Sequence, residues 1–305
     1  MLLREDLQLF VVADGAGGHA AGDVAAQLGA DTISAVLEDR LQAETPALDF
    51  DDCGVPQAAR WLVSAVHRAN AAVYAAAQQE ASQRGMGSTV VALLFVPDTG
   101  QLHLAHVGDS RCYRWRGGHL EQLTRDHSLV NDVLEERPDI DGAVLARLPR
   151  NVVTRALGMA PRIRVAISTH EAVRGDRYLL CTDGLSGFVP HQRLVSILAE
   201  ARPPGALAQL LINAADEAGG HDNVGVIIVD CLDVRASVAR EWERSAAEHR
   251  VVRARAVQAS EPEILLVGIE EVDLEEAIAT LTDPERERDS CDMLLDILQK
   301  RGGSR

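Results

Sequence analysis

Short hydrophobic runs in this chain are separated by two long alanine-rich stretches. Several of the runs are joined by tight turns such as residues 97–100, so we expect strands there that pair mainly antiparallel. Residues 19–43 and 56–83 repeat apolar positions at helical spacing, which predicts helices. The predicted strands lie at residues 7–13, 88–96, 101–107, 111–115, 162–168, 177–182 and 224–230. Two helices followed by several consecutive strands favour an α+β sandwich with helices packed on sheets.

The composition changes near residue 234, where charged sequence rich in arginine and glutamate begins. We therefore expect a domain over residues 1–234 and a mostly helical C-terminal appendage over residues 235–305. Within the appendage, the apolar residues 264–267 predict a short strand, and Asp283 followed by proline is typical of a helix start. No cluster of potential metal ligands occurs in this region of the sequence. A docking or regulatory role is therefore expected for it.

Composition narrows the class of protein. The chain has 305 residues, of which 47% are hydrophobic, and this is enough for a large buried core. A formal net charge of −16 argues against nonspecific binding to nucleic acid. Five scattered cysteines without a Cys-x-x-Cys pair do not suggest a disulfide framework or a zinc ribbon. No apolar stretch approaches the ~20 residues of a membrane helix and no signal peptide is recognisable, so we expect a cytoplasmic protein without a membrane partner.

Aspartates stand at the ends of four predicted strands. They occur in the pairs Asp14-Gly15, Gly108-Asp109, Asp183-Gly184 and Asp222-Asn223. Any one such pair can be ordinary turn chemistry. Four of them at strand ends indicate carboxylates gathered at the rim of a sheet, where mutual repulsion must be offset by protons or by hard cations such as Mg²⁺ or Mn²⁺.

Six further motifs follow Asp14 to Gly22 in a fixed order. They are Gly87-Ser88-Thr89, Val107 to Arg111, Leu123 to Ser128, Asn151 to Gly158, Cys181 to Leu185 and Gly219 to Asn223. Together they closely resemble the metal-dependent serine/threonine protein phosphatases (PPM family, type 2C) in their compact bacterial form. The resemblance covers about residues 7–232.

This resemblance implies a four-layer α/β/β/α sandwich, in which two antiparallel sheets face each other between helices and a metal centre lies at one edge. By the same resemblance, Asp14 bridges two metal ions, and Gly15 gives its backbone carbonyl to one of them. Asp183 and Asp222 would hold the other ion. Oxygen ligands favour Mn²⁺ or Mg²⁺, with two ions in the core site.

Two more positions have roles in the family. Asp109 matches a residue that helps to bind a third, weaker metal ion, with Asp183 shared. It can also be read as part of a hairpin turn. His19 matches the histidine proposed as the general acid for the leaving alcohol, although a histidine at this place can equally be a helix N-terminal residue.

The chain departs from the family pattern before Asp14. Family members carry a strand there with a phosphate-binding arginine, followed by an Asn-Glu-Asp element, whereas only 13 residues precede Asp14 here. Neither role is assigned to Arg4 or Asp6. We therefore expect this N-terminal strand to be missing, and three explanations stay open: a true start upstream, a domain that works without the strand, or lost catalysis. We hypothesise that residues 264–267 cover the resulting gap.

The expected activity is the hydrolysis of phosphoserine and phosphothreonine in proteins, by a hydroxide that bridges two divalent metal ions. The substrates would be phosphorylated proteins, with a bacterial serine/threonine kinase as the opposing enzyme. The main alternative is a catalytically weak or inactive regulatory protein with the same fold. A small-molecule phosphomonoesterase is a third possibility. Residues 129–150 correspond to a flap in the family and should affect substrate choice.

Overall fold

The computed structural model describes residues 1–16, 19–46, 50–51, 54–149, 151–220 and 222–232. The predicted appendage lies outside these residues, and so does its apolar segment 264–267. The domain boundary near residue 234 therefore stays a prediction. Among the described residues, 127–154 form a compact unit of their own, and the remainder forms a second unit that carries the sheets.

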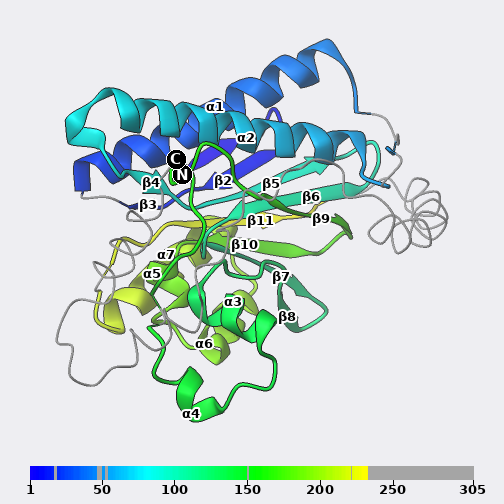
Figure 1. Ribbon diagram of the computed structural model, residues 1–305. Coiled ribbons are helices and arrows are strands. Elements are labelled where there is room, and N and C mark those ends of the chain that lie inside the picture. Colours follow the sequence, from blue (N-terminus) through cyan, green and yellow to red (C-terminus); the bar gives the residue numbers. More distant parts are fainter. Residues whose placement is uncertain (17–18, 47–49, 52–53, 150, 221, 233–305) are drawn as a thin grey trace. The chain divides into compact units, whose positions relative to one another are not determined.

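The sheet-bearing unit contains two main antiparallel sheets (Figure 1). The first has the order β1-β2-β5-β6-β9, formed by Leu2–Arg4, Leu9–Val12, Val90–Val96, Gln101–Val107 and Ala166–Glu171. The second has the order β11-β10-β7-β8, formed by Val226–Asp230, Arg177–Cys181, Arg111–Arg116 and His119–Gln122. A small ribbon pairs β3 (Gly15–Ala16) with β4 (Gly87–Ser88).

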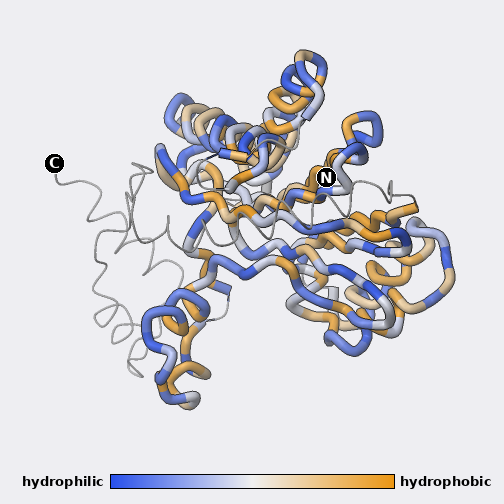
Figure 2. The backbone as a smooth tube through the Cα atoms, turned by 90° about the vertical axis from the view of Figure 1, so that its right-hand side faces the viewer, coloured by the Kyte–Doolittle hydropathy of each residue, from blue (hydrophilic) through white to orange (hydrophobic). Residues whose placement is uncertain are grey.

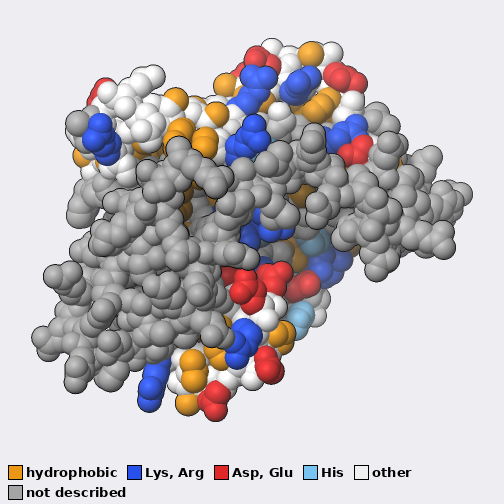
Figure 3. Space-filling model, in the orientation of Figure 1, with side chains coloured by type: hydrophobic (Ala, Val, Ile, Leu, Met, Phe, Trp, Pro, Cys, Tyr) orange, Lys and Arg blue, Asp and Glu red, His pale blue; other side chains and the backbone are white. Residues whose placement is uncertain are grey.

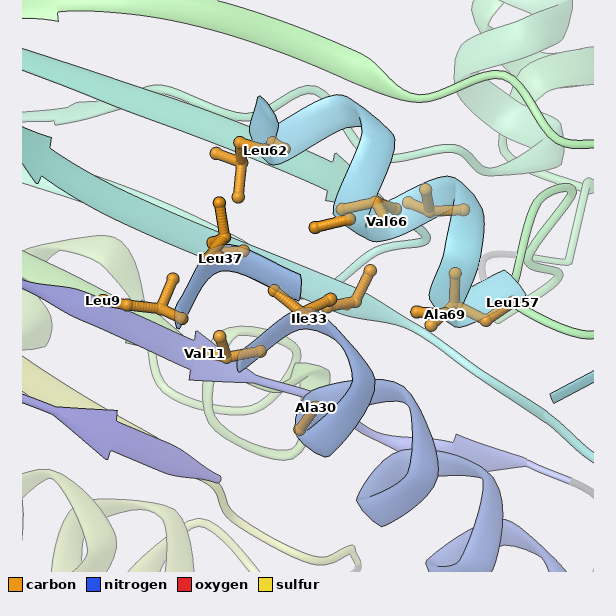
Figure 4. Close-up of a cluster of buried hydrophobic side chains, with 14 of the residues drawn as sticks. Leu9, Val11, Ala30, Ile33, Leu37, Leu62, Val66, Ala69 and Leu157 are labelled. Atoms are coloured by element: carbon orange, nitrogen blue, oxygen red, sulfur yellow. The ribbon is translucent and has the colours of Figure 1, made fainter. Parts of the chain in front are cut away.

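Strand β2 is buried on both faces, which explains why its sequence is an uninterrupted apolar run. Leu9 and Val11 point to one face and pack with the helices, as Figure 4 shows. Phe10 and Val12 point to the other face and pack with side chains of the second sheet. Alternate residues of one strand thus belong to two different layers of the core.

Helices α1 (His19–Ala43) and α2 (Gln57–Gln79) cover the outer face of the first sheet (Figure 1). Along these helices, at the top of Figure 2, hydrophobic and hydrophilic segments alternate, as one buried and one exposed face require. On the face drawn in Figure 3, their surface mixes charged and hydrophobic side chains. A short 3₁₀ turn, η1 (Ala81–Gln83), follows α2.

The outer face of the second sheet packs against α5 (Asp183–Ser186), α6 (His191–Leu198) and α7 (Pro204–Glu217). The layers therefore follow the order helices, sheet, sheet, helices, which confirms the predicted four-layer α+β sandwich. None of the helices among the described residues is long and apolar enough to span a membrane.

The first sheet begins with a short strand, β1, that was not predicted from the sequence, whereas the absence of the family's arginine-bearing N-terminal strand stays a prediction. Residues Leu2–Arg4 pair antiparallel with Leu9–Val11 and occupy the edge beside β2. A tight turn over residues 5–8 reverses the chain, with Gln8 at a φ of 53°. The hypothesis that residues 264–267 cover a gap stays a prediction, because these residues lie outside the described part of the chain.

Three strand boundaries also differ from the predictions. The run at 88–96 is interrupted at Thr89, which separates β4 from β5. The strand expected at 162–168 lies at Ala166–Glu171, because β6 offers pairing partners only from residue 166 onward. Strand β8 was not predicted, because His119–Gln122 is mostly polar and exposed.

The unit of residues 127–154 has a small hydrophobic core of its own. It contains α3 (Leu129–Glu136) and α4 (Gly142–Leu145). The buried residues of its core are Leu129, Val133, Leu148 and Val152. Its two ends are tied together, because the Thr154 N–H donates to the His127 carbonyl at 3.0 Å.

Candidate metal centre

Asp14 directly follows β2 and is held by its backbone. Its N–H donates to Thr89 Oγ1 at 3.2 Å, and its carbonyl accepts from the Thr89 N–H at 2.8 Å. The same carbonyl accepts from Ser88 Oγ at 2.9 Å. Because the main-chain groups of Asp14 are engaged by the link between β4 and β5, its half-buried carboxylate stays available for other partners.

The turn that carries Asp109 is fixed to the same link. Ser110 Oγ lies 2.7 Å from Thr89 Oγ1. Gly108 has a φ of +105°, and a Cβ at this position would lie 2.6 Å from Cβ of Thr89. Only glycine fits such a backbone at this distance. Thr89 thus forms hydrogen bonds both with the backbone of Asp14 and with the turn that carries Asp109.

Asp183 and Asp222 are connected through Thr182. The Thr182 N–H donates to the Gly225 carbonyl at 3.0 Å, and Thr182 Oγ1 donates to the Asn223 carbonyl at 3.1 Å. Asp222 itself accepts from the Asn223 N–H at 2.7 Å, which shapes the turn before β11. The threonine therefore fixes the loop of Asp222 beside the start of α5, where Asp183 is the first residue.

Gly184 makes this approach possible. A Cβ at Gly184 would lie 2.4 Å from the carbonyl oxygen of Asn223 and 3.4 Å from Cβ of Asp222. Glycine is therefore required at position 184 because two backbone segments lie in close contact there. This requirement adds to the preference for glycine in a turn.

The register of the second sheet explains why three of the aspartates converge. Cys181, the last residue of β10, pairs with the first residues of β7 and β11. Asp183 follows β10, whereas Asp109 and Asp222 precede its two neighbours. In an antiparallel sheet these three positions fall at one edge.

The first sheet reaches the same edge through the end of β2. A Cβ at Gly225 would lie 3.6 Å from Cγ1 of Val12 and 3.0 Å from Cγ2 of Thr182. Val12 is two residues before Asp14. The strand ends of both sheets therefore meet here, and Asp14 joins the other three aspartates.

The carboxylates affect one another electrostatically. Burial, the charge and hydrogen bond of Asp183, and the charges of Asp222 and Asp109 together raise the pKa of Asp14 to about 7, in that order of size. Burial and Asp183 raise the pKa of Asp109 to about 6. The pKa of Asp183 is also raised, first by burial. A set of acids that resists ionisation when brought together is stabilised by a cation.

These residues fit divalent cations by their chemistry, since all are oxygen donors and all lie at one edge of the sheets. Within the described ranges, no three His, Cys, Asp or Glu side chains are already arranged closely enough to form a finished metal cage. The assignment of Asp14, Asp183, Asp222 and Asp109 as ligands stays a prediction, which their shared location favours.

The remaining predicted site residues lie at the start of α1 and before it. Gly15 pairs with Ser88 in the small ribbon, and its absent Cβ would lie 2.0 Å from the carbonyl oxygen of Gly22. The bare backbone of Gly15 is thus needed for α1 to approach. His19 is the first residue of α1, and its role as general acid stays a prediction.

Arg111 is the cation nearest to Asp109 along the chain, and it is held by another acid. Its guanidinium donates to Asp126, with the shortest contact at 2.6 Å, and to the Tyr113 hydroxyl at 3.1 Å. Asp126 is half-buried in this pair. The sequence motifs contained Arg111 and Asp126, but their pairing required the fold to bring residues 15 positions apart together.

Arg4 is likewise engaged. It forms ion pairs with Asp6 at 2.7 Å and with Glu38 of α1 at 3.0 Å, and it donates to Ser34 at 3.1 Å. These contacts tie β1 to the outer helix layer. They give no support for a phosphate-binding role of Arg4.

Comparisons with known proteins match this architecture. A family model described as protein phosphatase 2C matches residues 3–209. The serine/threonine protein phosphatase PstP of Mycobacterium tuberculosis is 36% identical over 226 residues, which cover 74% of this chain and 41% of PstP. The chain thus spans less than half the length of that relative. The serine/threonine phosphatase stp of Listeria welshimeri is 32% identical over 227 residues, which cover 74% of this chain and 86% of stp.

A solved structure gives the same result. The catalytic domain of PstP, determined in complex with two manganese ions, is similar with a TM-score of 0.61 and 36% sequence identity. The similarity covers 74% of this chain and 88% of that one. With a family model over most of its length and relatives above 30% identity, this chain belongs to the protein phosphatase 2C family, among its bacterial PPM-type serine/threonine phosphatases.

Proposed function

We propose that this protein hydrolyses phosphoserine and phosphothreonine in other proteins, with divalent metal ions in the site, and that it opposes a serine/threonine kinase. The observation that supports this most directly is the convergence of Asp14, Asp109, Asp183 and Asp222 at one sheet edge with raised pKa values for the first three. We place the reaction in the cytoplasm, the compartment that the composition favours.

Asp14 would contact both core ions, with the Gly15 carbonyl on one and with Asp183 and Asp222 on the other. Asp109 would share a third, weaker ion with Asp183. Two divalent ions held there, Mn²⁺ or Mg²⁺, would lower the pKa of a water molecule between them and offset phosphate charge. The backbone anchors of Asp14 and Asp222 keep the carboxylates in place while the substrate exchanges.

His19 would donate a proton to the departing serine or threonine oxygen. It occupies the first position of α1, five residues after Asp14, so the proposed acid and one of the four carboxylates lie on one short stretch of chain. A histidine can supply a proton near neutral pH, and loss of such a donor typically lowers the rate by about 10²- to 10⁴-fold.

A regulatory protein with weak or no turnover is the second candidate. One observation favours it: Arg4, the arginine that precedes Asp14, is committed to Asp6 and Glu38. A phosphate group on a substrate would need other donors. If the metal ions do most of the chemistry, the lack of a phosphate-binding arginine should weaken substrate binding and appear mainly as a high KM.

The test is Mn²⁺-dependent hydrolysis of a phosphothreonine peptide by the full chain. Asp183→Asn should abolish the rate, because it removes a charge from the proposed core site. Asp39→Asn is the matched control, since Asp39 is exposed on α1. Calorimetric titration with Mn²⁺ provides a readout that does not depend on turnover.

The outcomes separate the candidates. Mn²⁺ binding and hydrolysis that both disappear in Asp183→Asn support the phosphatase. Mn²⁺ binding without hydrolysis above the Asp183→Asn level would favour the regulatory protein. Faster hydrolysis of a sugar phosphate than of the phosphopeptide would instead indicate a small-molecule phosphomonoesterase.

A further inference from the structure

Thr89 lies at the point where two pairs of strands meet. β2 pairs with β5 so that Val12 is opposite Val91, and the same register continues in the small ribbon of β3 and β4. Counting along this register from either side places Asp14 directly opposite Thr89. The residue that links β4 to β5 therefore faces the proposed bridging ligand of the metal centre.

The pair formed by Asp14 and Thr89 differs from a regular ladder in one hydrogen bond. In a regular hydrogen-bonded pair, two opposite residues exchange both backbone N–H···O=C bonds. The Thr89 N–H donates to the Asp14 carbonyl at 2.8 Å, as in such a pair. The Asp14 N–H, however, donates to Oγ1 of Thr89 at 3.2 Å, and the Thr89 carbonyl is within hydrogen-bond distance of Ser88 Oγ, at 2.7 Å. A side-chain hydroxyl therefore takes the place of a backbone carbonyl opposite Asp14.

The same hydroxyl contacts the turn that carries Asp109. Thr89 Oγ1 lies 2.7 Å from Oγ of Ser110, which directly follows Asp109, and both side chains are buried. A hydroxyl oxygen has two lone pairs and one proton, so it can accept from the Asp14 N–H and bond to Ser110 at the same time. One buried oxygen atom is thus shared by the backbone of one proposed ligand and the neighbour of another.

We propose that Thr89 is a positioning residue of the metal centre, whose hydroxyl orients the backbone of Asp14 and holds the turn of Asp109 beside it. The inference rests on the proposed function, since it takes both carboxylates as ligands of divalent ions. Thr89 acts through these two backbone segments and is not itself a ligand. Loss of groups that orient metal ligands in this way typically lowers metal affinity by about 10- to 100-fold.

Packing and strand propensity alone do not require threonine at position 89. Valine has nearly the same shape, and it is equally typical of strands. With valine, the Asp14 N–H would either lose its acceptor or turn toward the backbone carbonyl at position 89, as in a regular ladder. The backbone of Asp14 would change direction in both cases, and Ser110 would lose its bond. The hydroxyl of Thr89 is therefore the part of the side chain that matters for the site.

The experiment compares Mn²⁺ affinities of full-chain variants by calorimetric titration, and melting curves establish that each variant is folded. Thr89→Val removes the hydroxyl and keeps the shape of the side chain, whereas Thr89→Ser keeps the hydroxyl and removes the methyl group. Thr99→Val is the matched control. Thr99 is also buried, and its Oγ1 also accepts a backbone N–H at 3.2 Å, from Gln101 in the turn between β5 and β6.

Thr89→Val should weaken Mn²⁺ binding by about 10- to 100-fold. Thr89→Ser and Thr99→Val should bind Mn²⁺ about as tightly as the natural chain. Ser110→Ala should weaken binding less than Thr89→Val, because the bond from the Asp14 N–H to Thr89 stays in place. Combined with Thr89→Val it should add little, since the bond between the two hydroxyls is then already lost.

Equal Mn²⁺ affinity in Thr89→Val and the natural chain would overturn the inference. So would a loss that Thr89→Ser does not restore, or that Thr99→Val shares, because either result indicates a general effect on the fold. Losses in Thr89→Val and Ser110→Ala that add in full would overturn the link to the turn of Asp109. Mn²⁺ binding that Asp183→Asn does not weaken is a different result, since it would overturn the proposed function and this inference with it.

Discussion

Replacing Gly184 with alanine tests the contact that brings Asp183 and Asp222 together. The new Cβ would lie 2.4 Å from the Asn223 carbonyl oxygen, and a separation below 3.0 Å is essentially never seen. The Asn223 segment must therefore retreat by at least about 0.6 Å. Both partners are backbone, so no side chain can rotate away. Strain of this kind costs about 1–3 kcal/mol of unfolding free energy.

The functional cost should be larger than the loss of stability suggests. The displaced segment carries Asp222, and a misplacement approaching 1 Å at a reacting site can lower a rate about 10²-fold. We expect Gly184→Ala to raise the Mn²⁺ concentration needed for half-maximal activity and to lower the maximal rate on a phosphothreonine peptide. Calorimetric titration with Mn²⁺ measures the binding loss directly.

Gly205→Ala is the matched control, because a Cβ at this α7 position meets nothing within 4 Å. It should leave Mn²⁺ affinity unchanged and stabilise the fold by about 0.4–1 kcal/mol, since alanine loses less backbone freedom on folding. If Gly184→Ala and Gly205→Ala have the same Mn²⁺ affinity and rate, the close approach at Gly184 does not position the site.

Three further predictions concern stability. Because the pKa of Asp14 is raised to about 7, the folded chain binds more protons than the unfolded chain between about pH 4 and pH 7, so metal-free stability should fall as pH rises through this window. Denaturant titrations in EDTA should show that the unfolding free energy decreases with pH in this window, and that it decreases less steeply in Asp14→Asn. An equally steep decrease in Asp14→Asn would contradict the prediction. Gly108→Ala should lose about 1–3 kcal/mol, because its φ is +105° and its Cβ would meet Thr89, and a melting temperature equal to the natural chain's would refute this. Asp176→Ala should lose about 3 kcal/mol in urea unfolding, because the buried carboxylate pairs with Arg116 at 2.6 Å and also accepts from the Tyr178 hydroxyl at 2.8 Å and the Val173 N–H at 2.9 Å. Asp176→Asn keeps an acceptor and should lose less, and equal losses in the two variants would contradict this.

The fold was predictable from the sequence where apolar runs are long and continuous. The run before Asp14 and the strand at 101–107 were found because both faces of these strands are buried. Strand β8 was missed because only Leu120 of its four residues is buried, so its pattern resembles a loop. Strand β9 was displaced because Ile163 and Val165 pack on the helix-side core without being part of the strand, whereas its polar end pairs with β6.

The candidate site was predictable to a similar degree, for a different reason. Aspartates next to glycine at strand ends can be recognised in the sequence. Their location at one edge of the sheet then follows from the antiparallel register. The hydrogen bonds that hold the aspartate-bearing segments in place cannot be recognised in the sequence. Thr89 and Thr182 stand inside quoted motifs, but a threonine gives no sign in the sequence of which distant backbone it binds. That information exists only after β4 and β11 are in place.

The unit of residues 127–154 has its own small core and closely tied ends, with the Leu129 N–H donating to the Val152 carbonyl at 3.0 Å. A segment of this kind can be replaced as a whole by a segment of different sequence. Its length and its internal helices can change without altering the distance that the rest of the chain must span, because the entry and exit points stay paired. A graft between residues 127 and 154 from a relative should therefore leave the fold of the sheets and the strand-end aspartates in place.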